Sequence, residues 1–192
     1  MLNINSIFYK ILIFLLLPAS GFCDYNIKGK IIINGGYYYL IPEGSNKRLL
    51  IEVSDRIIRA RLTCLDDGDH LSGTAKKIGT ENVNINSIEY VSLNKLIASW
   101  RDENEIFTFS DFRNLYYWDF SRKNNKFHGP FIYHYALSPY GENLDQCLWK
   151  VFLIDNAGVI LGSLEWFAED QIMLKLYDSE SGEVSSTKNY SM

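Results

Sequence analysis

The residues best suited to hold a metal ion form one short acidic cluster, Asp66-Asp67-Gly68-Asp69. Calcium takes about six to eight oxygen ligands, which carboxylates and backbone carbonyls of one loop usually supply together. A helix-loop-helix calcium site alternates its acids, places glycine in the middle of the loop and ends in a distal glutamate. Here the acids are adjacent and glycine is third, which is typical of an ordinary hairpin turn. The cluster therefore predicts a turn between two strands.

The chain contains no recognisable catalytic motif. The three histidines, His70, His128 and His134, show no metal-ligand spacing. The Gly-x-Ser-x-Gly elbow of serine hydrolases and the phosphate-binding P-loop are both absent. Carboxylate pairs such as Glu103 and Glu105 are typical of a charged turn or an exposed face. We therefore expect no catalytic residue, no metal and no cofactor, and the enzymatic alternative is a hydrolase whose residues converge only in space.

The three cysteines, Cys23, Cys64 and Cys147, are candidates for one disulfide. In an oxidising compartment two of them would pair and leave one over. The sequence leaves all three pairings open, and no Cys-x-x-Cys pattern indicates a redox or zinc site. Cys64 lies on the apolar register of an expected strand, so a buried free thiol is the alternative for that residue.

Aromatic side chains are the candidate contacts for a ligand or a partner, namely Tyr37, Tyr38, Tyr39, Trp100 and Trp149. Neighbouring residues of a strand point to opposite faces, so at least one tyrosine of the consecutive trio faces outward. The competing interpretation of the tryptophans is core packing, because a small β domain needs large side chains to bury enough apolar area.

Short strands separated by turn residues must position these side chains, and no stretch shows a sustained helical period. The alternation of Ile58, Ala60, Leu62 and Cys64 predicts a strand. A shift of the alternation at Ile88 predicts a β-bulge. In the first half we expect strands over residues 27–33, 37–41, 49–53, 56–65, 70–75 and 83–93.

The second half of the chain holds most of the aromatic residues and repeats the alternation of strand and turn. Here we expect strands over residues 96–100, 106–109, 115–118, 131–137, 149–154, 159–167 and 172–177. The chain therefore predicts an all-β fold with two small antiparallel modules, residues 22–93 and 94–192.

Each module resembles a known kind of barrel. Strand number and turn spacing in the first module resemble a partly open, OB-like barrel. The second module resembles the small lipocalin-like exported domains of bacteria. Their opening Gly-x-Trp motif corresponds to Ala98-Ser99-Trp100, with alanine replacing glycine, and Trp149 and a Leu-Tyr-Asp…Ser-Gly-Glu turn follow. This resemblance implies an up-and-down barrel or sandwich with an apolar interior that can hold a ligand.

Residues 1–21 are typical of a secretory signal peptide. Lys10 precedes the apolar run 11–17, and the small residues Ala19 and Gly21 come just before a predicted cut ahead of Phe22. The run is shorter than the roughly 20 residues of a membrane-spanning helix, so we expect no stable membrane anchor after cleavage. Phe22 also argues against lipidation at Cys23, because lipidation requires a small residue there. The segment predicts a secreted or periplasmic protein.

The charge of the chain argues against nucleic acid as a partner. The net charge is −4, and the acidic excess lies in the second half. A nucleic-acid binder requires a net basic face that displaces counterions from phosphates. Together these features predict an exported, non-catalytic binding protein whose partner is a protein or a small apolar or glycan-like ligand. The non-catalytic alternative is a secreted inhibitor or effector that acts on another protein.

Overall fold

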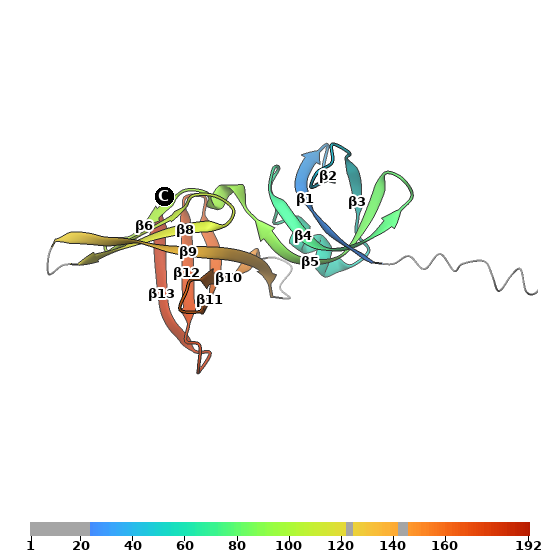
Figure 1. The fold of residues 1–192 in the computed structure, drawn as a ribbon. Coiled ribbons are helices and arrows are strands. Elements are labelled where there is room, and N and C mark those ends of the chain that lie inside the picture. The colour runs from blue at the N-terminus through green and yellow to red at the C-terminus, as the bar shows by residue number, and fades with distance from the viewer. Residues whose placement is uncertain (1–23, 122–124, 142–145) are drawn as a thin grey trace, which may run out of the picture.

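The computed structural model describes residues 24–121, 125–141 and 146–192, and the expected signal peptide lies outside these ranges. Within them, thirteen strands form two closed rings that lie side by side (Figure 1). The fold is all-β with two barrel modules, which confirms the fold class predicted from the sequence. No helix in this described part of the chain is long and apolar enough to cross a membrane.

The first barrel is a ring of strands in the order β1-β2-β3-β5-β4, closed by the pairing of β4 with β1. All pairings are antiparallel except that of β3 with β5, which is parallel. This order, with a helix between β3 and β4, is compatible with the OB-like resemblance, but the ring is closed where a partly open barrel was expected. The strands are β1 (Tyr25–Asn34), β2 (Tyr37–Pro42), β3 (Leu49–Glu52), β4 (His70–Ile78) and β5 (Asn82–Ser92).

Residues 56–65 contain a helix, α2 (Arg56–Leu62), where a strand was expected. The side chain of Asp55 caps it, accepting hydrogen bonds from the backbone N–H groups of Ile57 at 2.7 Å and Ile58 at 2.9 Å. Ile58 and Leu62 are both buried on one helical face. A spacing of four residues fits a two-residue period and a helical turn equally well, so the alternation alone was ambiguous. The aspartate cap favours the helix.

The second barrel is an eight-stranded, up-and-down ring in which each strand pairs with the next one in the chain. The ring closes where Ser191 of β13 pairs with Arg101 of β6. This architecture is compatible with the lipocalin-like resemblance. The strands are β6 (Ser99–Arg101), β7 (Glu105–Phe109), β8 (Asn114–Ser121), β9 (Lys126–Tyr140), β10 (Leu148–Ile154), β11 (Val159–Ala168), β12 (Gln171–Tyr177) and β13 (Val184–Ser191).

Strand β13 was not expected from the sequence. Its residues are mostly polar, and their burial pattern leaves only Tyr190 fully buried. The strand is held by its pairing with β12 and by the closure of the ring rather than by an apolar face of its own. Pairing with neighbouring strands therefore makes this segment a strand even though its own residues have only a weak preference for β structure.

The buried residues of both barrels form one contiguous cluster. Strand β5 of the first barrel pairs with β9 of the second through Val91 and Leu137, so the sheet is continuous between them. At this junction the second barrel is filled by Trp100 and Trp149, which are completely buried. The indole N–H of Trp100 donates a hydrogen bond to the Leu96 carbonyl at 3.0 Å. We call this the filled end of the second barrel.

Candidate functional site

The second barrel is hollow at the end opposite its filled end. A cavity of about 160 Å³ lies there, lined by residues of strands β7 to β13. A cavity of about 150 Å³ is sufficient to hold a benzene ring. The hollow end of the second barrel is therefore large enough for a small organic molecule.

The wall of the cavity is mainly apolar. Its aromatic part consists of Phe107, Tyr117, Tyr133 and Tyr190. The Phe107 ring stacks on Tyr117 with 4.7 Å between centroids and meets the edge of Tyr190 at 5.1 Å. These mutual contacts hold the three rings in place. The aliphatic part of the wall consists of Leu153, Ile160, Leu174 and Leu176.

Glu105 is the centre of a polar cluster inside this apolar wall. The Lys188 ammonium donates a hydrogen bond to Oε1 of Glu105, and the Tyr190 hydroxyl donates one to Oε2 at 2.7 Å. Only 12% of the Glu105 side chain is exposed. The expectation of a charged turn or exposed face at Glu105 is therefore wrong, because the residue lies on the inward register of β7 with Phe107 and Phe109.

A turn just before β7 sets the position of Glu105. The carboxylate of Asp102 accepts hydrogen bonds from the backbone N–H groups of Asn104 and Glu105, both at 2.7 Å. Aspartate side chains commonly stabilise such turns by bonding to the backbone two or three residues ahead. The start of β7 is thereby held in register with the rest of the ring.

The two tyrosines nearest Glu105 keep their protons. Burial, followed by the hydrogen bond to Glu105, raises the pKa of Tyr190 far above its ordinary value. Burial, followed by the negative charge of Glu105, does the same to the pKa of Tyr117. Both phenols therefore stay protonated at neutral pH, and the Tyr190 hydroxyl donates its hydrogen bond to Glu105.

The structure places the predicted contact residues away from this cavity. Trp100 and Trp149 pack in the filled end, and Tyr37, Tyr38 and Tyr39 lie on β2 of the first barrel. Tyr37 is 63% exposed, whereas Tyr38 packs partly against the core. The aromatic candidates are thus divided between the two barrels and do not form one site.

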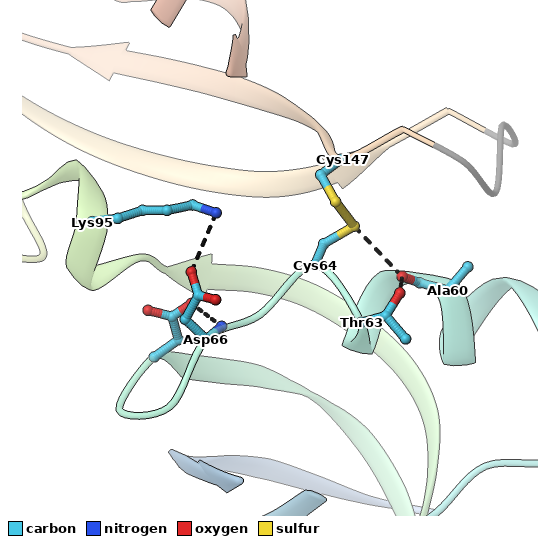
Figure 2. Close-up of a disulfide and its surroundings, with 7 residues drawn as sticks. Ala60, Thr63, Cys64, Asp66, Lys95 and Cys147 are labelled. Carbon is cyan, nitrogen blue, oxygen red and sulfur yellow. Dashed lines mark hydrogen bonds and ion pairs between the residues drawn. A yellow bond between two sulfur atoms is a disulfide. The ribbon is translucent and has the colours of Figure 1, made fainter. Parts of the chain in front are cut away.

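A disulfide joins Cys64 to Cys147, with 5.5 Å between their Cα atoms (Figure 2). It connects the end of α2 in the first barrel to the start of β10 in the second. Cys64 is therefore not a buried free thiol, and Cys23 lies outside the described residues. Close by, the Lys95 ammonium forms an ion pair with Asp66 at 3.3 Å across the same junction.

The acidic cluster is a turn between α2 and β4, not between two strands. Asp69 is completely buried, and its two oxygens accept hydrogen bonds from the backbone N–H groups of Asp66 at 2.8 Å and Asn94 at 2.7 Å. Asp67 accepts a further one from the N–H of Ile33 at 2.8 Å. In the residues that the structure describes, no group of three or more His, Cys, Asp or Glu side chains could hold a metal ion.

A larger but shallower groove of about 490 Å³ lies on the outer wall of the second barrel. Tyr140, Lys150, Leu161 and Tyr177 line it, and the Ser163 and Tyr177 hydroxyls are hydrogen-bonded at 3.0 Å. The Lys150 ammonium lies over the Tyr140 ring at 4.9 Å from its centroid, within the reach of about 6 Å for a cation–π contact. This groove is separate from the interior cavity, which shares none of its lining residues.

Sequence reasoning missed the residues that make the cavity polar. Glu105 carried a usable signal, because it alternates with Phe107 and Phe109 and shares their face. Lys188 and Tyr190 carried none, because their strand was not recognised.

The chain matches no protein family, no curated protein and no solved structure. The architecture and the cavity together define a double-barrel, all-β protein with one hollow barrel end.

Proposed function

We propose that the protein is an exported, non-catalytic binding protein that holds a small, mainly apolar ligand in the hollow end of its second barrel. The observation that carries this proposal is the cavity of about 160 Å³ between β7 and β13. Ligand sites of soluble proteins are typically concave and apolar, with a few polar groups that fix orientation. The Glu105 cluster inside an aromatic and aliphatic wall has this composition.

Pre-organisation supports binding at this end. Trp100 and Trp149 are buried at the filled end, and their packing supports the barrel wall next to the cavity. The rings of Phe107, Tyr117 and Tyr190 already contact one another. A site whose walls are fixed beforehand loses less conformational entropy when a ligand enters.

Export is supported by two independent features. The signal-like segment 1–21 directs a chain out of the cytoplasm. The Cys64–Cys147 disulfide is of the kind that persists in oxidising compartments.

The test is a titration of the labelled protein with benzyl alcohol, followed by NMR of its methyl groups. Binding in the cavity shifts the methyl signals of Leu153 and Ile160, whereas those of Leu137 at the filled end stay in place. Substitution Leu174→Phe fills the cavity and removes the shifts, at a packing cost of about 1–3 kcal/mol. The matched control Val159→Trp obstructs only the outer groove, because Val159 is 55% exposed there. Unchanged cavity methyls in the parent protein would reject the proposal.

A second candidate function is binding of a glycan-like ligand in the outer groove. The exposed ring of Tyr140 and the paired hydroxyls of Ser163 and Tyr177 favour it, since stacking on aromatic faces combined with hydroxyl hydrogen bonds suits a sugar. Titration with an oligosaccharide would then shift the Leu161 methyls. In that case Val159→Trp, and not Leu174→Phe, abolishes binding.

A further inference from the structure

The cavity contains a carboxylate that is already paired with a cation of the protein itself. Glu105 is buried, and the Lys188 ammonium occupies one of its oxygens. The other oxygen accepts the hydrogen bond from Tyr190. A buried carboxylate requires such partners, because an unpaired charge in an apolar wall is strongly destabilising.

The two charges of this pair differ in their freedom to move. The Glu105 side chain is 12% exposed, whereas that of Lys188 is 37% exposed. A lysine side chain can keep its apolar stem against the wall while its ammonium swings into solvent. The Glu105 carboxylate is thus a fixed part of the cavity wall, whereas the Lys188 ammonium can leave it for solvent.

The aromatic rings favour a cation at the same place. Phe107, Tyr117, Tyr133 and Tyr190 line the cavity that contains Glu105. The faces of aromatic rings attract cations, and rings beside a carboxylate are a recurrent way to bind an ammonium group. The wall therefore adds to the attraction of the carboxylate rather than opposing it.

Charge balance separates the candidate ligands. An organic ammonium that replaces the Lys188 ammonium leaves one negative and one positive charge in the cavity. An organic acid would bring a second negative charge close to Glu105, and the single ammonium of Lys188 would have to pair with both carboxylates. A neutral ligand would use the wall but would gain nothing from Glu105, whose oxygens are already occupied.

We propose that the ligand of the cavity is a small organic ammonium ion, which displaces Lys188 from Glu105 and lies among the four aromatic rings. This inference rests on the proposed function, because it names the chemical class of ligand for the same cavity. Lys188 then acts as a resident competitor that keeps Glu105 paired while the cavity is free of ligand.

The experiment compares three probes of similar shape: benzylamine, benzyl alcohol and benzoate. Each is titrated at neutral pH, with calorimetry for affinity and the Leu153 and Ile160 methyl signals for location. In the parent protein, benzylamine is expected to bind about tenfold more tightly than benzyl alcohol, and benzoate more weakly than either. Lys188→Met removes the competitor, so the affinity for benzylamine is expected to rise about tenfold while that for benzyl alcohol changes little.

A double variant controls for the possibility that a single substitution unfolds the protein. Glu105→Gln combined with Lys188→Met leaves a neutral cavity of similar shape, with no unpaired charge. This double variant is expected to bind benzyl alcohol normally and to lose its preference for benzylamine. Retained methyl signals of Leu137 at the filled end show that the fold is intact.

The outcomes separate the inference from the proposed function. Equal affinity for benzylamine and benzyl alcohol would overturn the ammonium assignment and leave the binding function standing. Tightest binding of benzoate, with weakening by Lys188→Met, would also overturn it and make the cavity an anion site. Failure of all three probes to shift the cavity methyls would overturn both proposals.

Discussion

Cys64 and Cys147 lie 83 residues apart in the chain, yet their sulfur atoms are bonded and join the two barrels. Figure 2 shows this bond between the end of α2 and the start of strand β10, with the Lys95–Asp66 ion pair nearby. Together with the pairing of Val91 and Leu137, this bond gives the junction covalent, backbone and ionic links. The orientation of the barrels is therefore fixed by several contacts of different kinds.

Loss of the disulfide is expected to lower the free energy of unfolding. A bond that closes a loop of this length restricts the unfolded chain strongly, and its removal by Cys147→Ser should cost about 4 kcal/mol. Urea unfolding of the purified mature protein measures this change. Cys23→Ser is the matched control and should leave the free energy unchanged. A loss of the same size in the control would show that Cys23, and not Cys64, is the disulfide partner of Cys147.

The raised pKa of Asp69 predicts how the free energy of unfolding depends on pH. Burial raises this pKa above its ordinary value, despite opposing hydrogen bonds from the Asn94 and Asp66 backbone. An acid with a raised folded-state pKa holds its proton longer in the folded chain than in the unfolded one. Its contribution to stability therefore falls as pH rises from the ordinary value of about 3.9 through the folded-state pKa.

The comparison of the parent protein with Asp69→Asn isolates this contribution. Asparagine cannot ionise, and it keeps one acceptor for the backbone N–H groups that Asp69 bonds. Urea titrations at a series of pH values measure the unfolding free energy of both proteins. Relative to that of Asp69→Asn, the unfolding free energy of the parent should fall as the pH rises across this window. Identical slopes for the two proteins would contradict the prediction.

Gly73 of β4 is expected to tolerate no side chain. A Cβ atom at this position would lie 2.0 Å from the carbonyl oxygen of Ser87 in the bulged strand β5. The register of β4 with β5 shifts on both sides of this contact, as the predicted bulge requires. Gly73→Ala should therefore destabilise the first barrel by about 2–4 kcal/mol, because backbone must move. Thermal unfolding measures the loss, with the exposed Lys77→Ala as a control that changes little.

The mature chain is expected to begin at Phe22. Mass spectrometry of the protein purified from its native source gives the first residue directly. Thiol counting on the denatured, unreduced protein should find one free cysteine, because Cys64 and Cys147 consume two of the three. Three free thiols would argue for a reducing compartment, and a lipid-modified Cys23 would overturn the expectation of an unanchored protein.

Much of the fold could be predicted from local patterns. Turn signals such as Asn34-Gly35-Gly36 separate β1 from β2 as expected, and the shift of alternation near Ile88 marks a real bulge. These features depend on neighbouring residues, so a sequence displays them directly. The helix α2 was misread because Ile58 and Leu62 satisfy both periods, and β13 was missed because it lacks apolar alternation.

The candidate site was much less accessible to sequence reasoning. The aromatic residues chosen as contacts include two that fill the barrel, because a sequence does not distinguish an inward ring that packs from one that lines a cavity. Trp149 and Tyr133 are both inward-facing, and only the depth of each in the barrel separates core from cavity.

The sequence by itself determined the all-β class and indicated two modules, since these follow from composition and short-range periodicity, and its first segment predicts export. Tertiary structure alone decided which cysteines pair, where the second barrel is hollow, and that Glu105 meets Lys188 and Tyr190. These partners are more than eighty residues apart in the chain. They meet because closing the ring brings β7 and β13 to the same barrel end, and closure is a property of the whole sheet rather than of any one strand.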